Sequence, residues 1–212
     1  MVAATLAAAL CAASAGPARA ATRIAAFGDS LSAGYQLPAA AAFPAVLEGA
    51  LRRDGYDVAV DNAAVSGDTT QGGVERLDWS VPDGTALAIV ELGANDMLRG
   101  IDPAVTAKNL DAIVSGLQKR HIGVLLAGMY ASLELDAAYR ERFAAIFPSL
   151  AKRAGVPLYP FFLAGIIGHP ELHLADGVHP NAAGVAVIVR NILPTVEESL
   201  KGLGVQPSGV KG

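Results

Sequence analysis

The feature of this sequence that most restricts its fold is the alternation of short apolar segments with longer segments of helical periodicity. The apolar segments predict strands at 23–27, 57–62, 87–92, 123–127 and, more briefly, 157–160. The periodic segments predict helices at 39–53, 70–77, 103–120, 137–154 and 183–200. Strands that are apolar throughout fit a parallel sheet with both faces covered by helices. We therefore predict an α/β fold with three layers, α/β/α, around a five-stranded parallel, flavodoxin-like sheet.

The bulk composition favours one folded domain that handles a small molecule. The chain has 212 residues, of which 52% are hydrophobic and 17% are charged, and this is enough apolar material for a full core. Its formal net charge is −4, and it contains no block of Lys or Arg. That charge disfavours nucleic acid and anionic membranes as partners. We expect a neutral or apolar small-molecule ligand and a monomeric protein.

The first 20 residues are predicted to be a signal peptide that is cleaved after Ala20. Residues 1–15 are almost wholly apolar, and Ala18-Arg19-Ala20 matches the A-x-A pattern of a cleavage site. A membrane anchor is the alternative, but the apolar run is shorter than the roughly 20 residues that a spanning helix needs. The mature protein is therefore expected to be periplasmic or secreted, with no membrane span.

Cleavage also removes Cys11, which is the only cysteine. Disulfides, a cysteine nucleophile and cysteine-based metal sites are thereby excluded. A lipid anchor is disfavoured because Leu10 precedes Cys11, where a lipoprotein site has a small residue. The predicted limits are 1–20 for the signal peptide, 21–202 for a single domain and 203–212 for a flexible C-terminal tail.

Four polar clusters follow predicted strands or lie near the end of the chain. They are Gly28-Asp29-Ser30-Leu31-Ser32-Ala33-Gly34-Tyr35, Ser66-Gly67-Asp68-Thr69-Thr70, Gly93-Ala94-Asn95-Asp96 and Asp176-Gly177-Val178-His179-Pro180. In open parallel sheets, ligands bind outside the carboxyl ends of the strands. We therefore expect the four clusters to meet at one edge of the sheet and to form the functional site.

Together the four clusters resemble the SGNH, or GDSL, hydrolase family, in order and in spacing. Within that family the sequence is most similar to bacterial periplasmic arylesterases and multifunctional acyl-thioesterase/lysophospholipase enzymes. The resemblance runs from about 23 to 200 and includes the string Glu91-Leu92-Gly93-Ala94-Asn95-Asp96. Ala94 stands where many relatives have glycine, but it has none of the catalytic roles. The resemblance implies the SGNH hydrolase fold and an enzyme that needs no metal or other cofactor.

The resemblance also implies a catalytic triad and an oxyanion hole. Ser30 resembles the nucleophile, and a serine hydroxyl needs a neighbouring base in order to react. His179 resembles that base, and Asp176 resembles the carboxylate that orients its imidazole. The backbone N–H groups of Ser30 and Gly67 and the side-chain amide of Asn95 resemble the oxyanion hole. A glycine at position 67 also suits a close approach of the backbone.

Apolar residues near these clusters are candidates for binding an acyl group. In relatives, the loop after the Asn95 cluster lines the acyl site. The predicted substrate-binding residues are Met97, Leu98, Ile101, Met129, Leu172 and Leu174. Tyr130 and Leu133 are further candidates for the same wall.

Several polar residues also have simpler structural explanations. Ser30 fits a helix N-cap, although Asp29 or Ser32 fits that role equally well. Asp29 and Asp96 are predicted to bond loop backbone, and Glu91 is predicted to be a buried, paired carboxylate. The remaining predictions are surface or loop positions for His121, His169 and His173 and core positions for Trp79, Phe161 and Phe162.

These observations predict a secreted serine hydrolase that cleaves carboxylic esters or thioesters with an apolar acyl part through an acyl-enzyme on Ser30. A carbohydrate deacetylase or acyltransferase would use the same fold and triad with a different substrate or acceptor. A non-catalytic flavodoxin-like binding protein would hold a phosphate or cofactor, but no Gly-x-Gly-x-x-Gly or Walker motif supports it. An α/β-hydrolase would carry Gly-x-Ser-x-Gly in mid-chain, whereas residue 32 is serine.

Overall fold

The computed structural model describes residues 20–208, so residues 1–19 of the predicted signal peptide and residues 209–212 lie outside it. Within this range five parallel strands form one sheet: β1 (Thr22–Gly28), β2 (Val58–Asn62), β3 (Leu87–Glu91), β4 (Gly123–Ala127) and β5 (Leu158–Tyr159). The strand order is β2-β1-β3-β4-β5, which is the flavodoxin-like order. The predicted fold class and sheet are confirmed.

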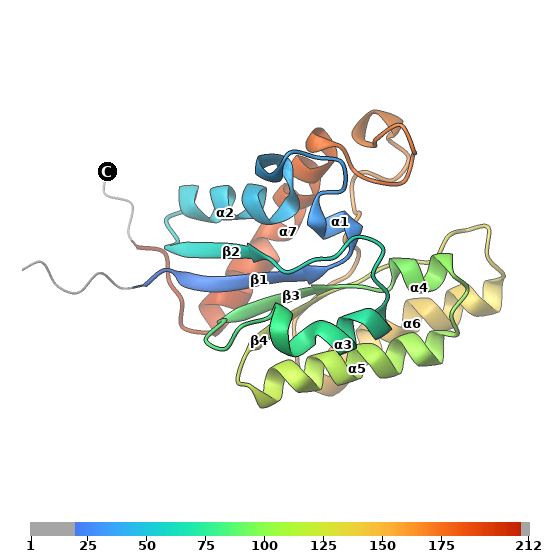
Figure 1. Ribbon diagram of the computed structural model, residues 1–212, viewed down its shortest axis with the longest axis horizontal. Helices are drawn as coiled ribbons and strands as arrows, with labels where there is room; N and C mark the ends of the chain where they lie inside the picture. Colours follow the sequence, from blue (N-terminus) through green and yellow to red (C-terminus); the bar gives the residue numbers. More distant parts are fainter. Residues whose placement is uncertain (1–19, 209–212) are drawn as a thin grey trace, which may run out of the picture.

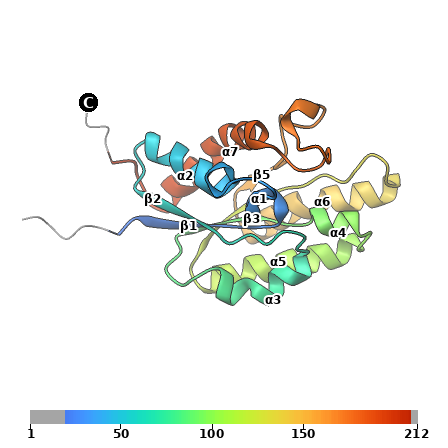
Figure 2. The ribbon, with the colours of Figure 1, turned by 45° about the horizontal axis from the view of Figure 1, so that its top comes forward.

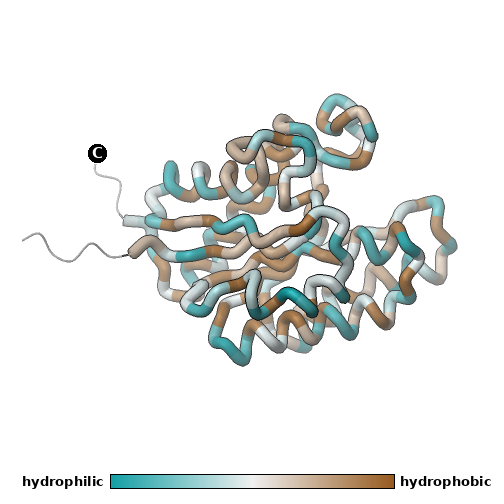
Figure 3. The backbone as a smooth tube through the Cα atoms, in the orientation of Figure 1, coloured by the Kyte–Doolittle hydropathy of each residue, from teal (hydrophilic) through white to brown (hydrophobic). Residues whose placement is uncertain are grey.

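Helices cover both faces of the sheet, as Figures 1 and 2 show from two directions. One face carries α2 (Phe43–Arg53) and α7 (Ala182–Gly202), and the other carries α3 (Thr70–Ser80), α5 (Pro103–Lys119) and α6 (Ala137–Ala154). Strand β3 is buried along its whole length, and hydrophobic residues run along the central strands in Figure 3. Burial on both faces explains why these strands are apolar throughout.

The chain order of the strands reverses at β1, which pairs with β2 on one side and with β3 on the other. In sheets of this kind the crevice at the reversal point is where ligands bind. Two short helices begin there: α1 (Ser30–Ala33) directly after β1, and α4 (Ala94–Leu98) directly after β3. The sheet topology therefore brings the first and third polar clusters together.

The prediction of one helix over 39–53 is wrong. The structure has a short 3-10 helix, η1 (Ala39–Ala41), then an extended residue at Ala42, and α2 begins at Phe43. Pro44 lies in the first turn of α2. In a continuous helix its ring would clash with the carbonyl of Ala40, and this clash favours a helix that starts next to Pro44. The other predicted strands and helices differ from the observed bounds by at most three residues at either end.

The short helices α1 and α4 and the 3-10 helix η2 (Pro170–Leu172) were not predicted. Each is too short to give a periodic apolar pattern. Across residues 20–208, none of the helices is both long enough and apolar enough to span a membrane.

The described part of the C-terminal segment contacts the domain. The Ser208 N–H donates to the Gly55 carbonyl at 2.8 Å, and a Cβ added at Gly123 would lie 2.6 Å from the Leu203 side chain. The domain limits, including a tail that starts at 203, remain predictions.

Candidate active site

Ser30 is the first residue of α1, and its hydroxyl faces the imidazole of His179. Ser30 Oγ lies 2.9 Å from His179 Nε2, which is hydrogen-bond distance for transfer of the serine proton to a neutral imidazole. The N-cap of α1 is Asp29, whose carboxylate accepts the N–H of Leu31. The helix start therefore does not need the Ser30 hydroxyl as a cap, and the hydroxyl is free for His179.

Asp176 and His179 lie on one tight loop before α7. Asp176 Oδ1 accepts the backbone N–H groups of Val178 and His179, and Oδ2 lies 2.8 Å from His179 Nδ1. The pKa of Asp176 is lowered to about 2, chiefly by these backbone hydrogen bonds and to a smaller extent by the hydrogen bond from the imidazole. The carboxylate is thus fully ionised at neutral pH, and the Nδ1 atom that faces it carries a proton.

The loop is held to its surroundings by two further contacts. The Asn181 side chain caps α7 through the N–H groups of Ala183 and Gly184 and donates to the carbonyl of His173. The ring of Tyr35, which follows α1, lies 4.4 Å from the His179 ring between centroids. His179 is therefore fixed from both its own loop and the loop after β1.

Asn95 lies in the first turn of α4 and lines the same cavity as Ser30 and His179. Its Nδ2 donates to Asp29 Oδ2 at 3.0 Å. Gly67 has a positive φ of 82°, which favours glycine, and its carbonyl accepts a hydrogen bond from Arg99. Gly67 lies outside the lining of the cavity, so the structure brings Asn95 to the site more directly than it brings Gly67.

A buried arginine joins the segments that carry Gly67 and Ser30. Arg76 on α3 donates to the carbonyls of Gly28 at 2.8 Å and Ala63 at 2.5 Å. Its Nε also donates to the Asp68 carboxylate at 2.5 Å. One guanidinium thus bonds to three segments, which are the end of β1, the end of β2 and the Gly67 loop. These hydrogen bonds hold the three segments in one arrangement.

A second buried network joins the Asn95 cluster to the start of α3. Asp96 accepts hydrogen bonds from the backbone N–H and the hydroxyl of Thr70 and from the hydroxyl of Thr106. Asn109 donates to the Thr70 hydroxyl. Asp96 is therefore a structural residue, as predicted, but the backbone that it bonds is the first residue of α3 and not a loop.

Glu91 at the end of β3 is fully buried beneath Asp29. Its Oε2 accepts the Ser32 hydroxyl at 2.8 Å and the Asp29 N–H at 3.4 Å, while Oε1 has no hydrogen-bond partner. A Cβ added at Gly28 would lie 2.6 Å from Glu91 Oε2, so only glycine fits beside this carboxyl. The predicted burial is confirmed, but only one of the two oxygens is paired.

The two buried carboxyl groups have unequal pKa values. Burial, and then the nearby Asp29 carboxylate, raise the pKa of Glu91 well above its usual value. Burial raises the pKa of Asp29 to about 6, and hydrogen bonds from Leu31 and Asn95 oppose that rise. Glu91 therefore holds a proton more strongly than Asp29 does, and Asp29 is the carboxyl of the pair that ionises first.

A cavity of about 660 Å³ opens beside Ser30 and His179. Three of the predicted substrate-binding residues line it, namely Met97, Leu98 and Met129. The other three do not. The Ile101 carbonyl accepts the hydroxyl of Tyr139 on α6, Leu172 packs against the core, and Leu174 faces a separate depression. These three residues therefore lie outside the lining of this cavity, and their role in binding substrate stays a prediction.

Other apolar residues complete the wall of this cavity. They come from the loops after β4 and β5 and from the loop of His179: Tyr130, Leu133, Phe161, Leu163, Ile167 and Val178. Tyr130 and Leu133 were predicted candidates, whereas Phe161 was predicted to lie in the core. Phe161 lies two residues after the end of β5, so the rule that ligands bind beyond strand ends could have found it.

The remaining predictions assigned aromatic residues to the core and three histidines to the surface or to loops, and only some of them agree with the structure. Phe162 is fully buried, as predicted, but Trp79 is 73% exposed. Trp79 is at the end of α3, where the helix face turns to solvent, and single exposed apolar residues are common. His121 and His169 are exposed, whereas His173 is half-buried and lines the cavity.

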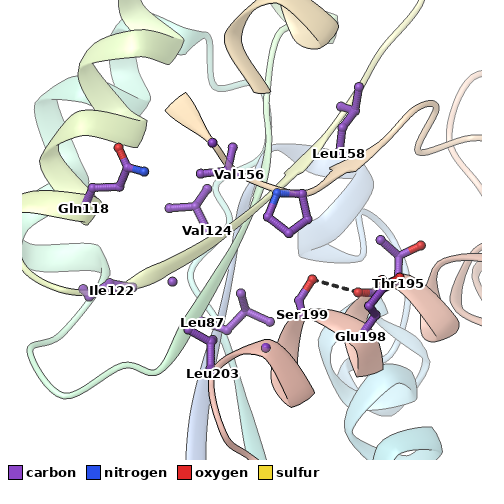
Figure 4. Close-up of a pocket in the computed structure, with 14 residues that line it drawn as sticks. Leu87, Gln118, Ile122, Val124, Val156, Leu158, Thr195, Glu198, Ser199 and Leu203 are labelled. Carbon is purple, nitrogen blue, oxygen red and sulfur yellow. Dashed lines mark hydrogen bonds between the residues drawn. The ribbon is translucent and has the colours of Figure 1, made fainter. Parts of the chain in front are cut away.

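A second cavity, of about 680 Å³, lies at the opposite end of the sheet (Figure 4). Its lining includes the first residues of β3 and β4, Leu87 and Gly123, together with residues of α7. The Ser199 hydroxyl in that lining donates to the Thr195 carbonyl at 2.8 Å within α7. None of the four polar clusters contributes to this cavity, so it is not part of the candidate active site.

The fold and these clusters define an SGNH-type hydrolase, and comparison with known proteins identifies the family. Residues 26–187 match the GDSL-like Lipase/Acylhydrolase family. The chain therefore belongs to this family, and it is an enzyme of the carboxylic ester hydrolase class. The recognition made from the four clusters is confirmed.

Individual relatives cover most of the chain. An arylesterase from Vibrio mimicus is 41% identical over 157 residues, which are 72% of this chain and 77% of the relative. The thioesterase 1/protease 1/lysophospholipase L1 of Escherichia coli (strain K12) is 39% identical over 155 residues, 73% of either chain. The crystal structure of AlinE4, an SGNH-hydrolase family esterase, is 45% identical with a TM-score of 0.72 and covers 85% of this chain and 97% of AlinE4.

Proposed function

We propose that this protein hydrolyses carboxylic esters or thioesters through an acyl-enzyme on Ser30. The observation that carries the proposal is the continuous chain of short contacts from Ser30 Oγ to His179 and on to Asp176, at 2.9 Å and 2.8 Å. His179 takes the Ser30 proton as Oγ attacks the carbonyl carbon, and it then gives that proton to the leaving alcohol or thiol. Water, activated by His179 in the same way, releases the acid and restores Ser30.

The negative charge that develops on the carbonyl oxygen needs hydrogen-bond donors. The candidates are the backbone N–H groups of Ser30 and Gly67 and the Nδ2 amide of Asn95. Asn95 has stronger structural support than Gly67, because Asn95 lines the same cavity as Ser30 and His179.

The apolar cavity favours a substrate with an apolar acyl part. One part of its wall is formed by Met97 and Leu98 of α4 and by Met129, which follows β4. Another part is formed by Phe161 and Ile167, which follow β5. An acyl chain placed against these side chains gains binding energy from leaving water. The relatives named arylesterase and thioesterase/lysophospholipase support esters and thioesters equally.

We also propose that the protein is exported and works as a monomer outside the cytoplasm. The Ala18-Arg19-Ala20 pattern after an apolar segment supports export with cleavage after Ala20. The domain limits that follow are 21–202 for the hydrolase domain and 203–212 for the tail.

A covalent label combined with a set of matched substrates tests the proposal. A fluorophosphonate is expected to modify Ser30, as located by peptide mass spectrometry. Each methylene added to the acyl group, from acetyl to butyryl p-nitrophenyl esters, is expected to raise kcat/KM about threefold to fourfold, at about 0.8 kcal/mol per buried CH₂. The succinyl monoester, similar in length to butyryl but ending in a carboxylate, serves as the matched control and should react far more slowly.

Three other results would contradict the proposed function. Labelling of a serine other than Ser30 would remove the assigned nucleophile. A preference for acetyl over butyryl esters would favour a deacetylase. Transfer of most acyl groups to an added alcohol would favour an acyltransferase.

Asp176→Asn is expected to lower kcat by about 10⁴-fold, as a matching substitution does in another triad enzyme. The Asn oxygen can still accept the N–H groups of Val178 and His179, which places its NH₂ group against His179 Nδ1. The imidazole then carries its proton on Nε2 and cannot take the proton of Ser30. Steady-state kinetics with a butyryl ester measures the loss, and an unchanged Tm shows that the loop is intact. A variant with more than about one tenth of the wild-type kcat would contradict the role given to Asp176.

A further inference from the structure

Asp29 is fully buried next to the proposed nucleophile, and the mechanism above gives it no role. Its Oδ1 accepts the N–H of Leu31 and its Oδ2 accepts Nδ2 of Asn95, each at 3.0 Å. The first bond caps α1. The second bond joins α1 to α4 and reaches a side chain that lines the catalytic cavity.

The contact to Asn95 determines which end of the amide faces the cavity. A carboxylate can only accept hydrogen bonds, so an ionised Asp29 holds the NH₂ end of Asn95 toward itself. That nitrogen carries a second N–H, which remains for a group in the cavity. If the amide turned over, its carbonyl oxygen would take that place and repel a developing oxyanion.

Glu91 helps to keep Asp29 ionised. Glu91 Oε1 is buried without a partner, and an ionised carboxylate with an unpaired buried oxygen is costly. A proton is therefore held more strongly by Glu91 than by Asp29, and Asp29 is the anion of the pair. Two other ionisable groups act on Asp29: His179 lowers its pKa and Asp68 raises it.

We infer that Asp29 is a positioning residue that orients the Asn95 amide so that one N–H points at the reacting carbonyl oxygen. This inference rests on the proposed function, in which Asn95 is an oxyanion donor. Asp29 also borders the cavity, but its two carboxylate oxygens accept Leu31 and Asn95, so it acts through Asn95.

Two substitutions separate the contact to Asn95 from the cap of α1. Asp29→Asn preserves the shape but replaces one accepting oxygen by a donor, so either Leu31 or Asn95 loses its acceptor. Asp29→Ser retains a hydroxyl that can cap α1 but is too short to hold Asn95. Each variant is expected to lower kcat by about 10- to 100-fold, less than the 10²- to 10³-fold expected for loss of a whole oxyanion donor. KM should change little, because the donor acts in the transition state.

A double-mutant cycle with Asn95→Ala tests whether Asp29 acts through Asn95. In the Asn95→Ala background there is no amide to orient, so Asp29→Asn and Asp29→Ser should lower kcat by less than about threefold. A residue needed only for folding would lower kcat by the same factor in both backgrounds. Tm values of all variants, measured in parallel, report any loss of stability.

The pH dependence gives a second measurement that needs no Asp29 variant. As the pH falls through about 6, Asp29 gains a proton and can donate to the Asn95 carbonyl, so the orientation of the amide is lost. The contribution of Asn95 is therefore present above this pH and lost below it. Other pH-dependent steps of the reaction are common to the wild type and Asn95→Ala, so the ratio of their kcat values isolates the contribution of Asn95. This ratio is expected to fall toward 1 below about pH 6.

The outcomes distinguish the inference from the function on which it rests. Ester turnover that survives Ser30→Ala overturns the proposed function. If Ser30→Ala is inactive, the inference alone is overturned by wild-type kcat in both Asp29 variants, by equal losses in the two backgrounds, or by a kcat ratio that does not vary with pH.

Discussion

Ser30→Ala is expected to lower kcat for ester hydrolysis by about 10⁵- to 10⁶-fold, the loss known for triad serines in other hydrolases. Alanine cannot form the acyl-enzyme, so both halves of the reaction lose their covalent route. What remains is the slow attack of water on an ester held near His179 and the oxyanion donors. Hydrolysis of p-nitrophenyl butyrate at high enzyme concentration measures the residual rate.

Ser32→Ala is the matched control for this loss. Ser32 lies two residues away on α1, but its hydroxyl donates to Glu91 and not to His179. The substitution removes one buried hydrogen bond, which costs about 1 kcal/mol of stability. It should lower Tm and retain most of the activity. Similar losses of kcat in the two variants would show that the nucleophile has been misassigned.

His179→Ala is expected to lower kcat by a similar factor, about 10⁵- to 10⁶-fold, because Ser30 then has no base within reach. Residues that act as one unit are not additive, so adding Ser30→Ala should lower the rate little further. Fluorophosphonate labelling of Ser30 should slow in parallel with ester hydrolysis, because both begin with activation of the same hydroxyl.

His173→Ala is the control for the histidine. His173 also lines the cavity, but its Nδ1 lies 3.0 Å from the His169 carbonyl, so it supports the loop instead of Ser30. This variant should retain kcat within about tenfold, since it loses one partly exposed hydrogen bond. A loss as large as that of His179→Ala would mean that the base is shared or that the loop cannot hold its shape.

The strands, and hence the sheet, were predictable because their signal is local. Apolar segments such as 123–127 carry their own pattern, and covering helices on both faces require that pattern. The helix over 39–53 was wrong because the apolar pattern outweighed the preference of Pro44 for a helix start, whereas Pro148 and Pro194 do lie inside α6 and α7. The one-turn helices α1 and α4 had no periodic signal at all, since a single turn contains no repeat.

The wall of the cavity was harder to predict than its polar groups. Met97 and Leu98 follow Asn95 closely in the sequence, and the structure brings them to the same cavity. Leu174 lies as close in the sequence to His179, but the loop turns its side chain toward another depression. Phe161 lies far from every motif and reaches the cavity because β5 is the last strand beyond β4.

The sequence alone determined the class of fold, the family, and the residues that are candidates for the chemistry, because strand patterns and motifs are contained in short stretches of chain. Only the tertiary structure decided how those residues meet. Ser30 and His179 are 149 positions apart, and their 2.9 Å contact depends on the packing of α7 and the loop before it. The charge difference between Asp29 and Glu91, and the bond from Asn95 to Asp29, likewise depend on burial. Burial arises from contacts among distant segments, and no local pattern records it.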